Sequence, residues 1–291
     1  MNKDERIEKD SFLKYVGFSA LLSNSNIVSD QLEFAIKNEQ LFIHYQPLVD
    51  FITGKIIGVE ALIRWQHPVR GFISPSEFIP FAEQSGQIYE IERFVVKAAL
   101  IQKQKWEEEC YGNLKISINL SSRTLTSDEN FFRLETLLES FNVDYSNIVF
   151  EITETAIISD IKVAIKRLER LRKKRISIAL DDFGTGYSSL SYLKDVPLNI
   201  VKLDRTFINC IKENSRETFI IKALISLAKD LNYDVIAEGV ETCEQLQFLI
   251  SHNCNVGQGY LFSKPLPIHL INEKIKMGYY DLSNCSNKVI L

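Results

Sequence analysis

The sequence predicts an α/β protein built as a modified TIM (β/α)8 barrel with an antiparallel first strand. From about residue 41, eight β-rich runs alternate with longer amphipathic stretches over roughly 250 residues. The first two runs are joined only by the segment DFITG at 50–54. That segment is too short for a helical crossover, so these two strands should be antiparallel. A doubly wound open sheet is the alternative, but a count of eight strands favours closure into a barrel.

The expected strands are runs rich in apolar and β-branched residues, separated by polar or turn-forming segments. In chain order they occupy residues 41–49, 55–65, 115–121, 148–154, 176–182, 199–204, 234–240 and 256–262. Helices are clearest at 90–109 and 160–174, where apolar residues recur at helical spacing and charged residues fill the other face. No repeat or linker divides the chain. We therefore expect an N-terminal helical or flexible extension at 1–28, one barrel at 29–275 and a C-terminal tail at 276–291.

Composition and charge narrow the classes of function. The chain has 291 residues, of which 45% are hydrophobic and 25% charged, as in ordinary globular proteins. A net charge of -4 and a pI near 5.7 argue against binding a nucleic-acid polymer, which normally needs a basic surface. An anionic substrate would need a local positive charge, and a bound metal ion would supply one.

The cysteines and the N-terminus predict a cytoplasmic protein. The five cysteines are odd in number and form no C-x-x-C pair, so we expect reduced thiols rather than a disulfide framework or a zinc site. No apolar run approaches the ~18 residues of a membrane span, and the charged first ten residues are unlike a signal peptide. The apolar segment 11–22 contains Lys14, and we expect it to pack on the domain or on a partner.

Acid and amide residues recur at the carboxyl ends of the expected strands, where barrel enzymes place their catalytic groups. In chain order they are Glu60, Asn119, Glu151, Glu154, Asp181, Asp182, Asp204, Glu238, Glu241 and Gln258, with Arg64 and Lys202 beside them. Each residue alone is more often a solvated or structural group. Together, so many negative charges would repel one another unless divalent cations neutralised them. Oxygen ligands suit Mg²⁺ or Mn²⁺ rather than zinc, and the four histidines are dispersed.

The adjacent Asp181 and Asp182 favour phosphate chemistry. Neighbouring strand residues point to opposite faces, and burying one unpaired carboxylate is costly, so we expect the strand to end there. One aspartate could then bridge two cations about 3.5–4 Å apart, an arrangement that promotes displacement at phosphorus. Lys202 would position the attacking water, and Arg64 would suit a phosphate. A barrel that abstracts a proton next to a carboxylate is an alternative that this aspartate pair disfavours.

Seven sequence blocks resemble the EAL-domain cyclic di-GMP phosphodiesterases and follow that family's order. They are EALIRW at 60–65, INLSS at 118–122, FEITET at 150–155, DDFGTGYSSLSYL at 181–193, VKLDRTFI at 201–208, AEGVET at 237–242 and QGYLFSKPLP at 258–267. The resemblance covers about residues 30–275 and implies a TIM-like barrel with an antiparallel first strand. It also implies hydrolysis of cyclic di-GMP to linear pGpG with two Mg²⁺ or Mn²⁺ ions.

By motif position, the resemblance implies a role for each residue of the site. One metal would be held by Glu60, Asn119, Glu151 and Asp181, and the other by Asp181, Asp182 and Glu238. Lys202 would contact the catalytic water, and Gln258 would lie near it. Arg64 would contact a substrate phosphate, and Glu154 would steady the loop after Asp182. Asp204 would lie beside the metals, and the remaining pocket residues would be Gln46, Leu62, Glu241 and Tyr260.

The resemblance leaves a second class of function open, a receptor that binds cyclic di-GMP without cleaving it. Inactive relatives typically lack a metal ligand, whereas the ligand set and the DDFGTGYSSL loop are complete here, which favours an enzyme. The loop and helix after Asp182 could support a homodimer. A sensory or cyclase partner would lie outside this chain, which is either a stand-alone domain or a piece of a longer protein.

Overall fold

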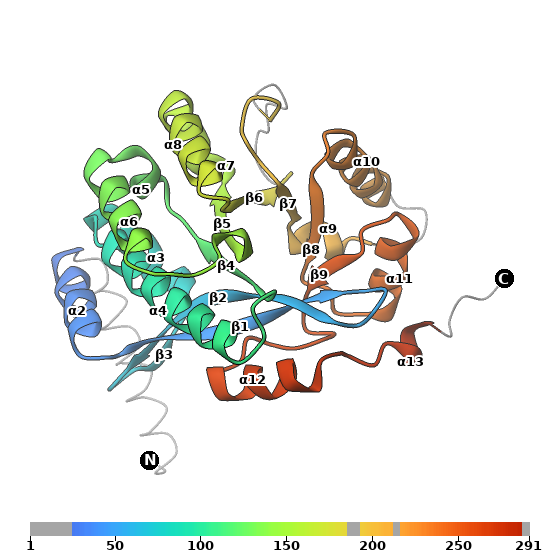
Figure 1. Cartoon of the computed structure of the whole chain (residues 1–291), viewed down its shortest axis with the longest axis horizontal. Helices are drawn as coiled ribbons and strands as arrows, with labels where there is room; N and C mark the ends of the chain where they lie inside the picture. The colour runs from blue at the N-terminus through green and yellow to red at the C-terminus, as the bar shows by residue number, and fades with distance from the viewer. Residues whose placement is uncertain (1–24, 185–192, 212–215, 287–291) are drawn as a thin grey trace, which may run out of the picture. The chain divides into compact units, whose positions relative to one another are not determined.

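The computed structural model describes residues 25–184, 193–211 and 216–286 (Figure 1). These residues divide into two compact units. The first contains residues 25–42 together with Ile63–Ile91, and the second contains Ile43–Leu62 and the described residues from Glu92 to 286. Two strands, β1 (Leu41–Asp50) and β2 (Ile56–His67), have residues in both units.

The first unit packs around an aromatic residue at the end of β2. Its other elements are α2 (Ser25–Lys37), β3 (Gly71–Ile73) and α3 (Pro75–Ser85). The last residues of β2 pair antiparallel with β3. Trp65 is 2% exposed, its ring meets Phe78 edge-on at 5.5 Å between centroids, and its indole N–H donates to the Gln40 side chain at 3.1 Å. These contacts fix β3 and α3 against β2.

In the described part of the second unit, eight strands form a closed barrel. After β1 and β2 they are β4 (Lys115–Asn119), β5 (Ile148–Thr153), β6 (Ser177–Phe183), β7 (Ile200–Leu203), β8 (Asp234–Glu238) and β9 (Val256–Gln258). Strand β1 is antiparallel to both β9 and β2, and the pairing of β1 with β2 closes the ring. From β2 through β4 to β9 the neighbouring strands are parallel. The predicted barrel and its antiparallel first strand are both confirmed.

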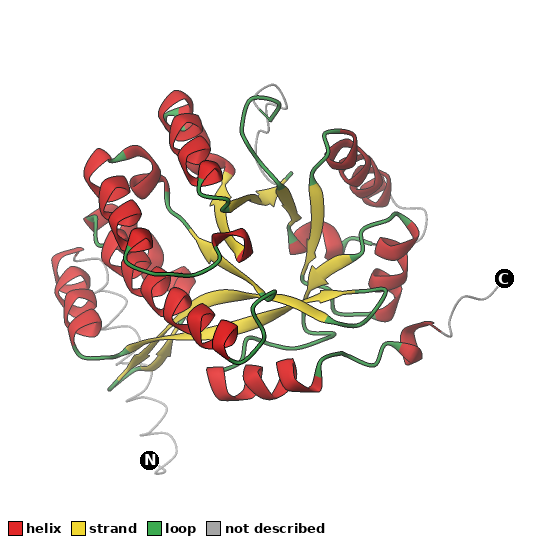
Figure 2. Ribbon diagram, viewed as in Figure 1, coloured by secondary structure: helices red, strands yellow, loops and turns green. Residues whose placement is uncertain are grey.

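Helices of this unit lie around the outside of the strands (Figure 2). They are α4 (Ile88–Glu108), α5 (Ser122–Thr126), α6 (Asp128–Glu139), η1 (Tyr145–Asn147), α7 (Glu154–Ile158), α8 (Ile161–Lys173), α9 (Arg205–Asn209), α10 (Arg216–Asp230), α11 (Cys243–Ser251), α12 (Ile268–Met277) and α13 (Ser283–Ser286). Helix α8 illustrates how such a helix begins and packs. Asp160 caps it by accepting the Val163 backbone N–H at 3.2 Å, and Ala164, Leu168 and Leu171 form its buried stripe.

Inside the ring, side chains lie in layers, because alternate strand residues face inward. One apolar layer is made of Leu48, Val149, Ala179, Ile200 and Ile236. Two positions further along β5, β6, β7 and β8 come Glu151, Asp181, Lys202 and Glu238. This apolar layer therefore supports the polar groups at the carboxyl ends of the strands.

The prediction of reduced thiols is wrong for one pair. Cys243, which begins α11, is bonded to Cys285 in α13, with their Cα atoms 5.0 Å apart. A separation of 42 residues hides the pair in the sequence, but the C-terminal segment returns to α11, where the Gln247 side chain donates to the Cys285 carbonyl. Because disulfides are rare in reducing compartments, this bond removes one argument for a cytoplasmic protein. The other cysteines are free thiols, Cys110, Cys210 and Cys254.

Two predictions fall largely on residues outside the described ranges. They concern the N-terminal extension with its segment 11–22, and the dimer contact after Asp182, which centres on residues 185–192. Within the described ranges, no helix is both long enough and apolar enough to cross a membrane.

Candidate active site

An ammonium group surrounded by carboxylates lies at the carboxyl end of the barrel strands. Lys202 of β7 is 1% exposed, and its Nζ lies 2.6 Å from Glu151 and 2.6 Å from Glu238. The same atom lies 3.3 Å from Asp181 and 3.6 Å from Glu60. The four acids come from β5, β8, β6 and β2. One ammonium therefore joins carboxylates from four strands.

The adjacent aspartates reach one site because β6 is bulged. Its pairing with β7 shifts register between Leu180 and Phe183, and Asp182 has a φ of 56°, in the left-handed region. A bulge interrupts the alternation of a strand and redirects a side chain. As a result, carboxylate oxygens of Asp181, Asp182 and Glu238 lie within 4.8 Å of one another. The strand continues one residue past the expected end, to Phe183, and the bulge rather than the strand end brings both carboxylates together.

Two amides hold the carboxylate of Glu60. Asn119 Nδ2 donates to its Oε1 at 3.1 Å, and Gln258 Nε2 donates to its Oε2 at 2.5 Å. The same Gln258 nitrogen donates to Glu238 Oε1 at 3.1 Å. Gln258 therefore links the acid on β2 to the acid on β8.

Burial and the shared ammonium move the pKa values of these groups in different directions. Burial alone would raise the pKa of Glu60, but the Lys202 charge and the two amide hydrogen bonds outweigh it and hold the pKa below its usual value. Burial, reinforced by the Glu60 charge, raises the pKa of Glu151 well above its usual value. Burial raises the pKa of Glu238 to about 8, although Lys202 opposes the shift. Burial would lower the pKa of Lys202, but the surrounding carboxylates raise it well above its usual value, so this lysine keeps its proton.

The donor set fits divalent cations that prefer oxygen ligands. Five carboxylates and one ammonium carry four net negative charges when all are ionised, which is the charge that two divalent cations neutralise. The carboxylates belong to Glu60, Glu151, Asp181, Asp182 and Glu238. Asp181 Oδ1 is buried and accepts no hydrogen bond from the described residues, and its 3.3 Å ion pair with Lys202 leaves it able to coordinate a metal ion. Carboxylate and amide oxygens favour Mg²⁺ or Mn²⁺ over zinc.

Two further predicted residues have local structural contacts. Gln46 Nε2 donates to the carbonyl of Ser263 at 3.3 Å. Asp204 caps α9 by accepting the backbone N–H of Thr206 at 2.9 Å. Burial, then the charge of Asp181, then that of Asp204 raise the pKa of Asp182. Asp204 is therefore both a helix cap and an electrostatic neighbour of the acidic site.

The remaining predicted residues differ in burial and in their local contacts. Glu154 begins α7 and is 7% exposed, Leu62 is half-buried on β2, and Glu241 is exposed in the loop after β8. Tyr260 is 58% exposed, with the Lys264 ammonium 5.3 Å from the centre of its ring. Arg64 belongs to the first unit, where its guanidinium donates to the carbonyl of Ile63 at 2.8 Å. Contact of these residues with a substrate stays a prediction.

Sequence reasoning misses Glu92, which holds the loop that follows Asn119. Its carboxylate accepts hydrogen bonds from the Ser121 backbone N–H and the Thr124 hydroxyl. Glu92 is 7% exposed on α4, next to the buried Ile91. An acid within the apolar stripe of an expected helix is the signal that could have revealed it.

Sequence reasoning also misses the role of Gly259. A Cβ at this position would overlap the backbone of Val240, so only glycine allows the end of β9 to lie this close to the loop after β8. The Val240 backbone N–H donates to the Gln258 carbonyl at 3.0 Å. This close approach places Gln258 beside Glu238.

Comparisons with known proteins identify the family to which the chain belongs. Residues 29–265 match the model of the EAL domain. The cyclic di-GMP phosphodiesterase NbdA of Pseudomonas aeruginosa is 36% identical over 254 residues, which cover 87% of this chain and 32% of that protein. The cyclic di-GMP phosphodiesterase PdeR of Escherichia coli K12 is 39% identical over 236 residues, which cover 81% of this chain and 35% of that protein. The chain thus spans about a third of the length of these curated relatives.

A solved structure supports the same relationship. The PaMucR phosphodiesterase in complex with c-di-GMP superposes with a TM-score of 0.80 at 37% sequence identity. The match covers 84% of this chain and 99% of that one, so the likeness includes the whole barrel rather than a single motif.

Proposed function

Because this chain belongs to the EAL domain family, we propose that it hydrolyses cyclic di-GMP to linear pGpG with two bound Mg²⁺ or Mn²⁺ ions. The observation that carries the proposal is the cluster around Lys202, to which the bulge in β6 brings both adjacent aspartates. It lies at the carboxyl ends of the strands, where barrel enzymes carry out their chemistry.

The oxygen-bearing residues of the cluster would divide between two cations. Glu60, Asn119, Glu151 and Asp181 would hold the first, and Asp181, Asp182 and Glu238 would hold the second. EAL domains are generally metal-dependent. When bound, such ions polarise a phosphate and lower the pKa of a coordinated water.

The chain's own polar groups prepare the site for an anionic substrate. Lys202 keeps its proton and supplies a fixed positive charge that orients the attacking water and stabilises charge developing on the phosphate. Glu60 has a lowered pKa and stays ionised as a ligand. Gln258 fixes the orientation of Glu60 and Glu238 through one amide nitrogen. The electrostatic arrangement is therefore in place before substrate arrives.

Substrate contacts would come from the other predicted residues. We assign the phosphate contact to Arg64, whose planar guanidinium suits bidentate hydrogen bonding. Glu154 would steady the segment after Asp182. The residues that would border the nucleotide are Gln46, Leu62, Asp204, Glu241 and Tyr260.

The decisive experiment incubates the purified 291-residue chain with cyclic di-GMP and separates the products by chromatography. We expect pGpG to accumulate with Mg²⁺ or Mn²⁺ and to stop after chelation. Binding measured by calorimetry without pGpG formation would instead identify a cyclic di-GMP receptor. Turnover that survives exhaustive chelation would overturn the two-metal mechanism.

A further inference from the structure

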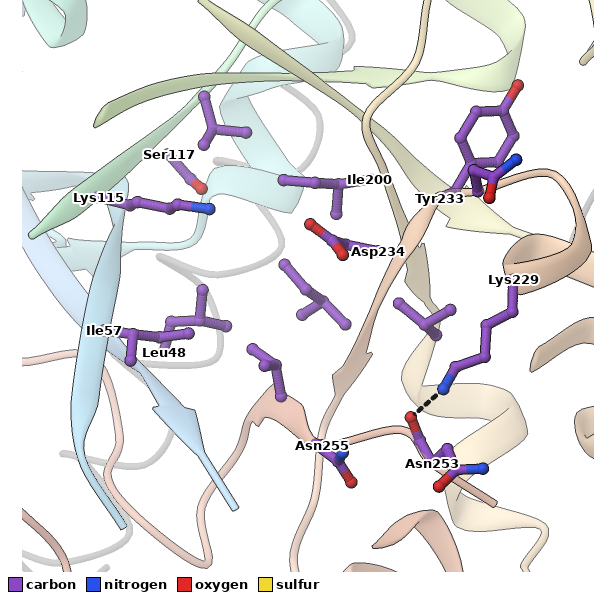
Figure 3. A pocket seen from close by; sticks show the side chains of 15 residues that line it. Leu48, Ile57, Lys115, Ser117, Ile200, Lys229, Tyr233, Asp234, Asn253 and Asn255 are labelled. Atoms are coloured by element: carbon purple, nitrogen blue, oxygen red, sulfur yellow. Dashed lines mark hydrogen bonds between the residues drawn. The ribbon is translucent and has the colours of Figure 1, made fainter. Parts of the chain in front are cut away.

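A cavity of about 610 Å³ lies at the amino-terminal mouth of the same barrel (Figure 3). Its floor includes Val149, Ile200 and Ile236, which belong to the apolar layer beneath the acidic cluster. Its rim is polar and includes Lys115 and Asp234. The volume falls within the range of several hundred cubic ångströms that is typical of small-molecule sites.

This cavity is separate from the candidate active site, although the same strands build both. On β4, Ser117 lines the cavity and Asn119 lies at the far end of the strand. On β8, Asp234 lines the cavity and Glu238 ends the strand in the acidic cluster. Because these strands are parallel, their first residues form one mouth of the barrel and their last residues form the other.

Two opposite charges share the cavity without pairing. In Figure 3 the Lys115 ammonium and the Asp234 carboxylate both point into the open space. Within the described ranges, neither side chain makes an ion pair or a hydrogen bond, and they do not pair with each other. Lys229 differs, because its ammonium donates to the Asn253 carbonyl at 2.5 Å. One cation and one anion on the rim are therefore available to a ligand.

A hydroxyl lies beside the available cation. Ser117 neighbours Lys115 on the cavity wall, and the residue as a whole is 6% exposed. Its hydroxyl has no hydrogen-bond partner among the described residues and lies open to the cavity. A donor at Lys115 and another at Ser117 together suit the two oxygens of a carboxylate.

We propose that this cavity binds a small zwitterion with an apolar body, of the class of a free α-amino acid or a dipeptide with an apolar side chain. The carboxylate is held by Lys115 and Ser117, the ammonium faces Asp234, and the apolar group lies on Val149, Ile200 and Ile236. The carboxylate, the ammonium and the apolar group of the ligand then each contact cavity residues of complementary chemistry.

The site is placed to affect the acidic cluster. Val149, Ile200 and Ile236 each precede a cluster residue by two positions on the same strand, a distance of roughly 7 Å along an extended chain. A ligand that fills the floor stiffens the layer on which Glu151, Lys202 and Glu238 rest. This link to activity depends on the proposed phosphodiesterase function, whereas binding to the cavity does not.

Calorimetric titration of the 291-residue chain tests binding independently of turnover. The probes are L-phenylalanine and L-alanyl-L-phenylalanine, with 3-phenylpropionate and 2-phenylethylamine as analogues that each keep only one charge. We expect both zwitterions to bind more tightly than either analogue. Tighter binding of the dipeptide would identify peptides as the ligand, and tighter binding of phenylalanine would identify free amino acids. Absence of heat with every probe at millimolar concentration overturns the proposal.

Two variants test the charges of Lys115 and Asp234 one at a time. Lys115→Met should weaken L-phenylalanine and 3-phenylpropionate by about tenfold and leave 2-phenylethylamine unchanged. Asp234→Asn should weaken L-phenylalanine and 2-phenylethylamine by about tenfold and leave 3-phenylpropionate unchanged. Lys166→Met and Asp195→Asn make the same chemical changes at exposed positions outside the cavity and should alter no affinity. Circular dichroism confirms that each variant is folded. If L-phenylalanine binds both cavity variants as tightly as the unchanged chain, the site is not the one proposed.

Discussion

The two mouths of the barrel are built by the same strands but differ in how far their charged side chains are buried and paired. At the carboxyl end, Glu60 and Glu151 are buried and an almost fully buried Lys202 lies between them. At the amino end, Lys115 is half-buried and Asp234 is exposed, and they do not pair. Burial makes an unpaired charge costly, whereas water screens a charge at the rim. The acidic cluster therefore needs a cation to be stable, whereas the charged residues at the amino-terminal mouth do not need a partner.

Asp181→Asn should have the largest effect, because it removes the carboxylate expected to bridge both cations while keeping the size of the side chain. We expect turnover of cyclic di-GMP to fall by on the order of 10³-fold. The affinity for Mn²⁺, measured by calorimetry in the absence of substrate, should fall as well. Asp195→Asn makes the same change at an exposed site and should leave both unchanged. Normal Mn²⁺ binding by the Asp181 variant would contradict the shared-ligand assignment.

Lys202→Met tests the claim that the cluster needs positive charge. Without metal, the variant leaves several buried carboxylates unpaired, which should cost about 3–5 kcal/mol of unfolding free energy. Added Mn²⁺ should restore more stability to this variant than to the unchanged chain, since the ion supplies the lost charge. Denaturant melts with and without Mn²⁺ measure both effects.

Lys103→Met is the matched control, because Lys103 is also fully buried but donates to the backbone carbonyls of Gly112 and Leu114. Among the described residues its single ion-pair partner is the part-exposed carboxylate of Glu107, at 3.5 Å. Loss of the Lys103 ammonium should lower stability without creating a response to Mn²⁺ beyond that of the unchanged chain. Equal Mn²⁺ responses in the two lysine variants would show that Lys202 has only a structural role.

The pH dependence of stability should differ between the metal-free and metal-bound protein. The folded-state pKa of Glu238 is about 8, above its usual value of 4.5, so between these values the folded state binds more protons than the unfolded state. This group's contribution is therefore present at low pH and lost as the pH rises through about 8. Thermal melts in chelator should show the decline, and Mn²⁺ should abolish it. Glu238→Gln should make the metal-free decline shallower, with the raised pKa values of Glu151 and Asp182 accounting for what remains, and an unchanged slope in that variant would refute the assignment.

Much of the barrel could be predicted because it depends on local patterns. Apolar runs gave the strands, and the short DFITG connection gave the antiparallel first pair, which the β1 pairings confirm. Strand β3 could not be predicted in the same way, because three residues are too few to show a period. Its existence depends on pairing with the end of β2, which is a tertiary interaction.

The positions of the acids could be predicted, but the means by which they meet could not. Alternation along a strand places Asp181 and Asp182 on opposite faces, and only the register shift against β7 and the left-handed φ of Asp182 override that rule. The Cys243–Cys285 bond was hidden for a similar reason, since it depends on where the C-terminal segment returns. Both features arise from contacts between distant parts of the chain.

Ile236→Val should have the smallest effect and tests whether the apolar layer supports the cluster without sharing its electrostatics. Ile236 is 5% exposed and precedes Glu238 by two residues on β8. Loss of one buried methylene should lower the unfolding free energy by about 1 kcal/mol. The backbone pairing of β8 with β7 and β9 still holds Glu238 in place, so the metal-free decline of stability between about pH 4.5 and 8 should keep its slope. A shallower decline in Ile236→Val, like that expected for Glu238→Gln, would show that packing at the layer sets the charge state of the cluster.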